Sequence, residues 1–167
     1  MRLISRRLLA ALLAAGLATG LVAALSHPSE AAEVVKVSLT DKGGAMDITL
    51  NLGMSMGGDM SKATMGIAID KTTVKAGEVT FAVTNDSKET IHEMLVSPVA
   101  DPAKPLPFVA SEFRVDEEAS RDLGEVSELD PGKSGALTVT LAPGTYILFC
   151  NVAGHYMSGM WTLLTVE

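Results

Sequence analysis

Three side chains that can bind a metal ion stand in one short run near the C-terminus. Cys150, His155 and Met160 are five residues apart in turn, and they supply a thiolate, an imidazole and a thioether from a single loop. The other histidines of the sequence are His27 and His92. A fold that completes a site around this loop must therefore bring one distant histidine to it.

The donor types in this loop favour copper. Two histidines and one cysteine in a trigonal arrangement, with a weak axial methionine, form the ligand set of blue copper electron carriers. The turn at Ala153–Gly154 lets the chain double back so that the three loop donors can converge. If His27 is removed with an N-terminal leader, one cysteine and two histidines remain, and His92 begins an apolar stretch.

Residues 1–31 have the features of a signal peptide. Basic residues precede an apolar stretch over residues 8–25, and small residues follow. We expect cleavage after Ala31, with cleavage after Ser26 or retention as a membrane anchor as the alternatives. Arg6–Arg7 resemble a twin-arginine export signal. This predicts a periplasmic protein without stable membrane association once the leader is removed.

The charge balance indicates the kind of partner. The full chain has a net charge of −7, and removal of three arginines and one glutamate with the leader makes it −9. Nucleic acid is disfavoured as a partner because phosphate binding needs a basic surface. An acidic protein instead suits a redox partner with a basic docking face. The single cysteine excludes an internal disulfide.

The mature sequence reads as short strands separated by Gly, Pro and Asn turns, which is typical of an all-β sandwich or barrel. We predict an N-terminal segment over 32–65 and the main domain over 66–167. Residues 98–128 are expected to form one long excursion, with a short helix within 116–123, over the edge of the sandwich. The predicted strands are 34–39, 46–50, 66–70, 79–84, 91–97, 136–141, 145–150 and 161–166.

These features together resemble the cupredoxin family. Residues 85–93 resemble its first-histidine strand, and residues 129–150 resemble its final hairpin. The spacing Cys-x4-His-x4-Met is similar to that of rusticyanin, sulfocyanin and auracyanin. The resemblance implies a Greek-key β-sandwich of eight strands with one type 1 copper. It assigns His92, Cys150 and His155 as equatorial ligands and Met160 as the axial ligand.

Two other methionines compete for the axial position. Met157 is only two residues beyond His155, which makes the position hard to reach, and Met94 shares a strand face with His92 and is expected in the core. Glu93 departs from family members that have Asn after the first histidine, where the Asn side chain connects the ligand loops.

Other chemistries fit the sequence less well. Zinc is disfavoured by the thioether and by the lack of a second cysteine. Dinuclear copper would need two cysteines in this loop, and a copper nitrite reductase would need further histidines. Cys150 with His155 as base could form a nucleophilic pair, but no third group orients the base. We therefore expect an electron carrier and no enzyme.

A second segment suggests an alternative function. Met54, Met56, Met60 and Met65 lie in a glycine-rich stretch with no obvious core to fill, and they resemble the methionine clusters of periplasmic copper-tolerance proteins. Thioethers are soft ligands that select Cu(I). The alternative is therefore a copper-handling protein that binds Cu(I) through this segment.

Overall fold

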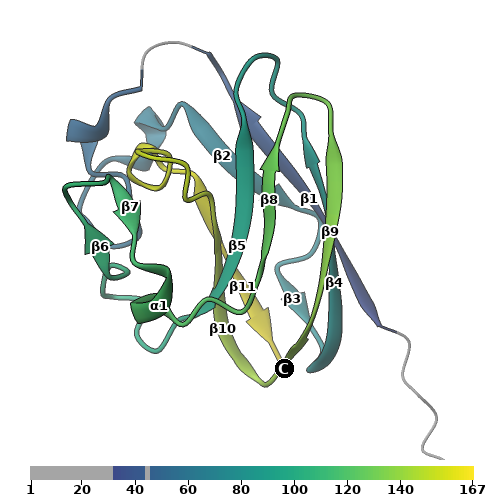
Figure 1. Cartoon of the computed structure of the whole chain (residues 1–167). Helices are drawn as coiled ribbons and strands as arrows, with labels where there is room; N and C mark the ends of the chain where they lie inside the picture. Colours follow the sequence, from purple (N-terminus) through teal and green to yellow (C-terminus); the bar gives the residue numbers. More distant parts are fainter. Residues whose placement is uncertain (1–31, 44–45) are drawn as a thin grey trace, which may run out of the picture. The chain divides into compact units, whose positions relative to one another are not determined.

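The computed structural model describes residues 32–43 and 46–167 (Figure 1). The predicted signal peptide lies outside the described residues. These described residues form one compact unit. Within the described ranges, no helix has the length and hydropathy of a membrane span.

Two β-sheets face each other in this unit (Figure 1). The first sheet has the order β2 (Met65–Ile69), β1 (Glu33–Asp41), β4 (Gly77–Asn85) and β9 (Ser134–Leu141). The second has the order β3 (Thr73–Val74), β11 (Trp161–Val166), β10 (Gly144–Phe149), β5 (His92–Pro98) and β8 (Glu125–Leu129). The prediction of an all-β sandwich is confirmed.

The remaining elements are short. They are the strand pair β6 (Phe108–Val109) and β7 (Arg114–Val115), the helical turn α1 (Glu117–Ser120), and three 3-10 turns, η1 (Ile48–Leu50), η2 (Met60–Lys62) and η3 (Tyr156–Ser158). The helix expected within 116–123 is α1, and Asp116 caps it by accepting a hydrogen bond from the backbone N–H of Ala119.

Alternating side chains fill the space between the sheets. In β4 the buried positions Val79, Phe81 and Val83 point inward, and the intervening residues are more exposed. Leu148 and Leu164 contribute from the second sheet to the same core. Burial of each such side chain stabilises the fold by about 1.5–3 kcal/mol.

The second sheet is covered on its other face as well. Leu95, Ile147 and Phe149 point away from the first sheet and pack against Leu106 and Val115 of the excursion. This explains why β5 is buried at nearly every position. Residues 99–124 therefore cover the outer face of the second sheet, whereas residues 125–128 form part of the edge strand β8. The prediction that the whole excursion 98–128 lies over the edge is wrong.

Two further predictions need correction. The alternating segment 46–50 does not form a strand, because Asp47 accepts a hydrogen bond from the backbone N–H of Thr49 and starts η1, and Asn51 ends it in the left-handed conformation. The boundary at residue 65 does not divide the sandwich. Strand β1 pairs with β2 in antiparallel and with β4 in parallel orientation, so it is an interior strand of the first sheet.

Candidate metal centre

His92 is the first residue of β5, and it follows a turn that side-chain hydrogen bonds stabilise. The side chain of Asn85 is buried and donates hydrogen bonds to the carbonyls of Thr90, at 2.8 Å, and Leu129, at 2.7 Å. Its Oδ1 accepts from the backbone N–H and the hydroxyl of Ser87. These bonds connect the turn to the end of β8. The segment that precedes His92 is therefore held in place, and it fixes the position of His92.

The other predicted donors come from the loop between β10 and β11. The backbone N–H of Cys150 donates to the carbonyl of Met160 at 3.1 Å, and that of Met160 donates to the carbonyl of His155 at 3.1 Å. Gly154 and Gly159 adopt positive φ angles of 84° and 93°, which favour glycine. The loop therefore closes on itself and brings Cys150, His155 and Met160 close together in space.

Neighbouring segments hold this loop from outside. The backbone N–H of Leu52 donates to the carbonyl of Met157 at 2.9 Å, and the indole of Trp161 donates to the carbonyl of Leu52 at 2.7 Å. Asn151 accepts from the backbone N–H of Val115 at 2.7 Å and donates to its carbonyl at 3.0 Å. The loop is thus held both by the connection between β1 and β2, which contains Leu52, and by the connection between β5 and β8, which contains Val115.

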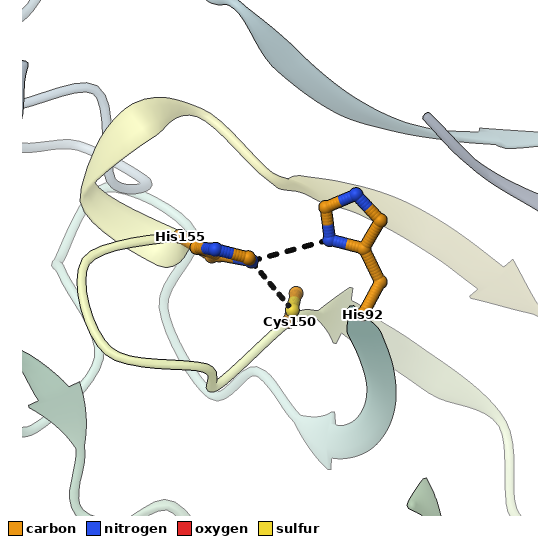
Figure 2. Close-up of side chains that lie close together, drawn as sticks. All are labelled: His92, Cys150 and His155. Carbon is orange, nitrogen blue, oxygen red and sulfur yellow. Dashed lines mark hydrogen bonds between the residues drawn. The ribbon is translucent and has the colours of Figure 1, made fainter. Parts of the chain in front are cut away.

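The two imidazoles and the thiol point toward one another (Figure 2). His92 Nδ1 lies 3.2 Å from His155 Nδ1, and His155 Nδ1 lies 3.3 Å from Cys150 Sγ. Two ligands bound to one ion at ~2.0–2.3 Å cannot be more than about 4.5 Å apart, and both distances satisfy this limit. Two imidazoles and one thiolate, with a thioether nearby, fit a single type 1 copper.

The surroundings keep both histidines neutral. Burial lowers the pKa of His92, although the carboxylate of Asp41 opposes this shift. Burial, reinforced by His92, lowers the pKa of His155 to about 4. Burial raises the pKa of the Cys150 thiol to about 12. Metal-free protein at neutral pH therefore presents two imidazole lone pairs, and only Cys150 must lose a proton to bind a metal.

Met160 lies beside the other loop residues, because its backbone is hydrogen-bonded to those of Cys150 and His155. It is fully buried and belongs to the same apolar cluster as Cys150 between the sheets. Met157 packs against the cluster on the opposite face of the second sheet. Met94 is also fully buried between the sheets, as expected of a core residue.

A β-bulge in the pairing of β5 with β8 lies where a backbone group of β5 donates a hydrogen bond to the cysteine. The pairing of β5 with β8 slips between His92 and Met94. The backbone N–H of Glu93, the residue between them, donates to Cys150 Sγ at 3.5 Å. Bulges often redirect a group beside a functional site in this way.

The side chain of Glu93 is itself unusual. It is 6% exposed, and its Oε1 has no hydrogen-bond partner. Burial raises the pKa of this carboxyl to about 7, and repulsion from the nearby Glu125 carboxylate adds to the shift. Asn151 connects the ligand loop to a different segment, because it bonds the backbone of Val115 in β7 and donates to Glu117 of α1 at 2.8 Å.

Asp41 is a neighbour of the site that the sequence did not indicate. Its Oδ2 lies 3.6 Å from His92 Nε2, on the side of the ring away from Cys150. A hydrogen bond with the Thr90 side chain is the main reason that the pKa of Asp41 is lowered. Asp41 is 51 positions before His92, and no local pattern connects the two residues.

The structure separates the four methionines of the glycine-rich segment. Met54 is 2% exposed and belongs to the core on the outer face of the second sheet, and Met56 packs against it. Met65 lies in β2 and packs against the core between the sheets, whereas Met60 is 42% exposed. The expectation that these residues have no core to fill is therefore wrong for Met54 and Met65.

We predict that Glu93 makes the metal-free protein less stable as the pH rises. The folded state keeps the Glu93 proton up to about pH 7, whereas the unfolded state loses it near 4.5. The free energy of unfolding should therefore fall by at most about 3 kcal/mol between these values. Urea titrations of metal-free protein at several pH values measure this dependence, and Glu93→Gln should remove the part of it that falls between these pH values. If the free energy of unfolding changes with pH equally in the two proteins, the burial of an unpaired carboxyl is contradicted.

Comparison with known proteins agrees with this geometry. Residues 124–167 match the family model of the sulfocyanin (SoxE) domain. Auracyanin-B of Chloroflexus aurantiacus is 51% identical over 39 residues, which are 23% of this chain and 17% of that protein. The aligned part thus spans less than a fifth of that relative.

Solved structures share the fold. Rusticyanin from Thiobacillus ferrooxidans aligns with a TM-score of 0.50 at 14% identity, over 81% of this chain and 78% of that one. An azurin (Az-iso2) from Methylomonas sp. strain J also gives 0.50, at 17% identity, over 83% of this chain and 99% of the azurin. The chain therefore shares the fold of these proteins, and the sulfocyanin match covers the loop that supplies the donors, so these findings support a relationship to the cupredoxin family of blue copper proteins.

Proposed function

We propose that this protein is an exported carrier of single electrons with one type 1 copper. The proposed equatorial ligands are His92, Cys150 and His155, and the proposed axial ligand is Met160. The observation that supports this best is that His92, Cys150 and His155 are buried with their donor atoms close together. His155 Nδ1 lies 3.2 Å from His92 Nδ1 and 3.3 Å from Cys150 Sγ. A carrier needs no substrate pocket, and we propose no enzymatic reaction.

Bound copper would supply a one-electron couple. A His₂Cys set with a weak methionine suits Cu(I) and Cu(II) moderately well, so neither state demands a new geometry. The protein contributes by keeping the ligands in place. The bonds from Asn85, Asn151 and Trp161 restrain every segment that carries a ligand. We infer that little rearrangement accompanies electron transfer.

His155 is the proposed exit for the electron. It is 5% exposed, whereas His92 and Cys150 are fully buried. Ala153 beside it is exposed and Met157 is half-buried, so a small apolar surface adjoins this ligand. The acidic net charge would attract a redox partner with a basic docking face over a longer range.

Replacement of the cysteine tests the copper assignment. We predict that wild-type protein loaded with Cu(II) is intensely blue or green, through charge transfer from the Cys150 thiolate. Cys150→Ser should abolish this band while keeping the fold, because serine is nearly isosteric. Visible and circular dichroism spectra provide the measurement. A colourless wild-type Cu(II) protein would refute the assignment.

Replacement of the axial ligand tests the fourth position. Met160→Leu should keep the band and raise the reduction potential, because a donor that favours Cu(II) is lost. Met157→Leu and Met94→Leu are the matched controls and should leave the potential nearly unchanged in voltammetry. A larger shift for either control than for Met160→Leu would reassign the axial ligand.

Cu(I) binding by Met54, Met56, Met60 and Met65 stays a prediction. A variant with all four changed to leucine should keep the core filled at Met54 and Met65 and lose one Cu(I) equivalent in competition with a chelator. A variant with only Met56→Leu and Met60→Leu measures how much of the Cu(I) binding depends on these two less buried methionines. Equal stoichiometry in all three proteins would exclude the copper-handling alternative.

We also propose export to the periplasm through the twin-arginine route. Replacement of both Arg6 and Arg7 by lysine should leave uncleaved precursor in the cytoplasm, because that route requires the arginine pair. Fractionation and immunoblotting would show the difference. Normal export of the variant would contradict the twin-arginine route and indicate general secretion.

A further inference from the structure

Two buried polar atoms face each other behind the proposed copper site, and neither has a hydrogen-bond partner. They are Nε2 of His92 and Oδ2 of Asp41, and they are 3.6 Å apart. Among the described residues, the only other buried side-chain atom of this kind is Glu93 Oε1. The separation is just beyond hydrogen-bond length, so a shift of a few tenths of an ångström would form the bond.

The chemistry of the imidazole ring decides which of the two atoms donates the hydrogen bond. Nδ1 of His92 points to His155 and Cys150, and a nitrogen that binds a metal cannot carry a proton. A neutral His92 must then carry its proton on Nε2. That N–H is buried and points to a carboxylate oxygen, which is an acceptor only.

The fold holds the carboxylate in place. Asp41 is the last residue of β1, and its backbone pairs with Met65 of β2. Its Oδ1 accepts from the backbone N–H of Gly43 at 3.0 Å, and its carboxylate also bonds the side chain of Thr90, two residues before His92. The carboxylate is therefore attached both to its own turn and to the approach of β5, and Oδ2 remains directed at His92.

We propose that Asp41 is a positioning residue of the copper site. It accepts the Nε2–H of His92, selects the tautomer that leaves Nδ1 free, and holds the ring plane. Its negative charge lies behind a ligand and favours the more positive oxidation state, so it raises the affinity for Cu(II) more than that for Cu(I). Carboxylates behind metal-bound histidines act in this way in other metal sites. The inference rests on the proposed copper binding.

The matched pair Asp41→Asn and Asp70→Asn tests the role. Each removes one negative charge from the β1–β2 hairpin, and Asp70 bonds the backbone N–H of Lys36 near the middle of β1, away from His92. Asp41→Asn should lower the ratio of Cu(II) to Cu(I) affinity about tenfold, which is a rise of about 59 mV in potential. Asp70→Asn should shift it much less. Equal shifts in the two variants would overturn the proposal.

Stability measurements separate positioning from a purely structural role. A structural role would lower the unfolding temperature of metal-free Asp41→Asn without moving the potential of the loaded variant, and that result would also overturn the proposal. Blue wild-type protein is the reference. If wild type binds no copper, the proposed function fails first, whereas a blue wild type with no shift in Asp41→Asn contradicts only the role of Asp41.

A measurement on unmodified protein covers the case in which Asp41→Asn does not fold. In wild type loaded with diamagnetic Cu(I), nitrogen-15 NMR should show His92 protonated at Nε2, with a proton that exchanges slowly with water. Met65→Leu provides a control for disturbance of the same β1–β2 pairing and should keep that proton. A rapidly exchanging Nε2 proton in wild type would contradict the hydrogen bond.

Discussion

Two neutral imidazoles and a thiol meet beside an apolar core, with His155 Nδ1 at 3.2 Å from His92 Nδ1 and 3.3 Å from Cys150 Sγ, and the surrounding segments hold them there. Such an arrangement is unfavourable by itself, because buried polar atoms need partners. Burial lowers the pKa of both histidines, so no positive charges repel each other at this distance. The donors therefore meet as ligands whose shared partner is a metal ion.

The two-sided burial of the second sheet provides the rigidity. Cys150 and Met160 belong to the core between the sheets, whereas Phe149 and Tyr156 of the same hairpin and loop belong to the core beneath the excursion. A movement of the ligand loop would disturb both cores. The long connections 46–64 and 99–124 contribute Met54, Leu106 and Val115 to the second of these cores.

The sequence predicted the site better than its surroundings. Cys150, His155 and Met160 are close in the chain, so their spacing alone indicated a common loop, and His92 followed as the histidine left after export. The main strands followed from alternation. Strand β8 was missed because only Val126 among its five residues is buried. The segment 46–50 alternates like a strand, but the cap by Asp47 directs it into a 3-10 turn. Asp41 could not be predicted, because its approach to His92 depends on tertiary packing between the sheets.

The most direct test of a preformed copper site is to compare crystal structures of metal-free and Cu(II)-loaded protein. We expect one ion to occupy the point between His92, Cys150 and His155, and the donor atoms of these residues to move by less than about 0.5 Å on loading. Met160 Sδ should be the fourth and most distant donor. An ion bound elsewhere, or a ligand loop that rearranges to bind it, would show that the site is not preformed.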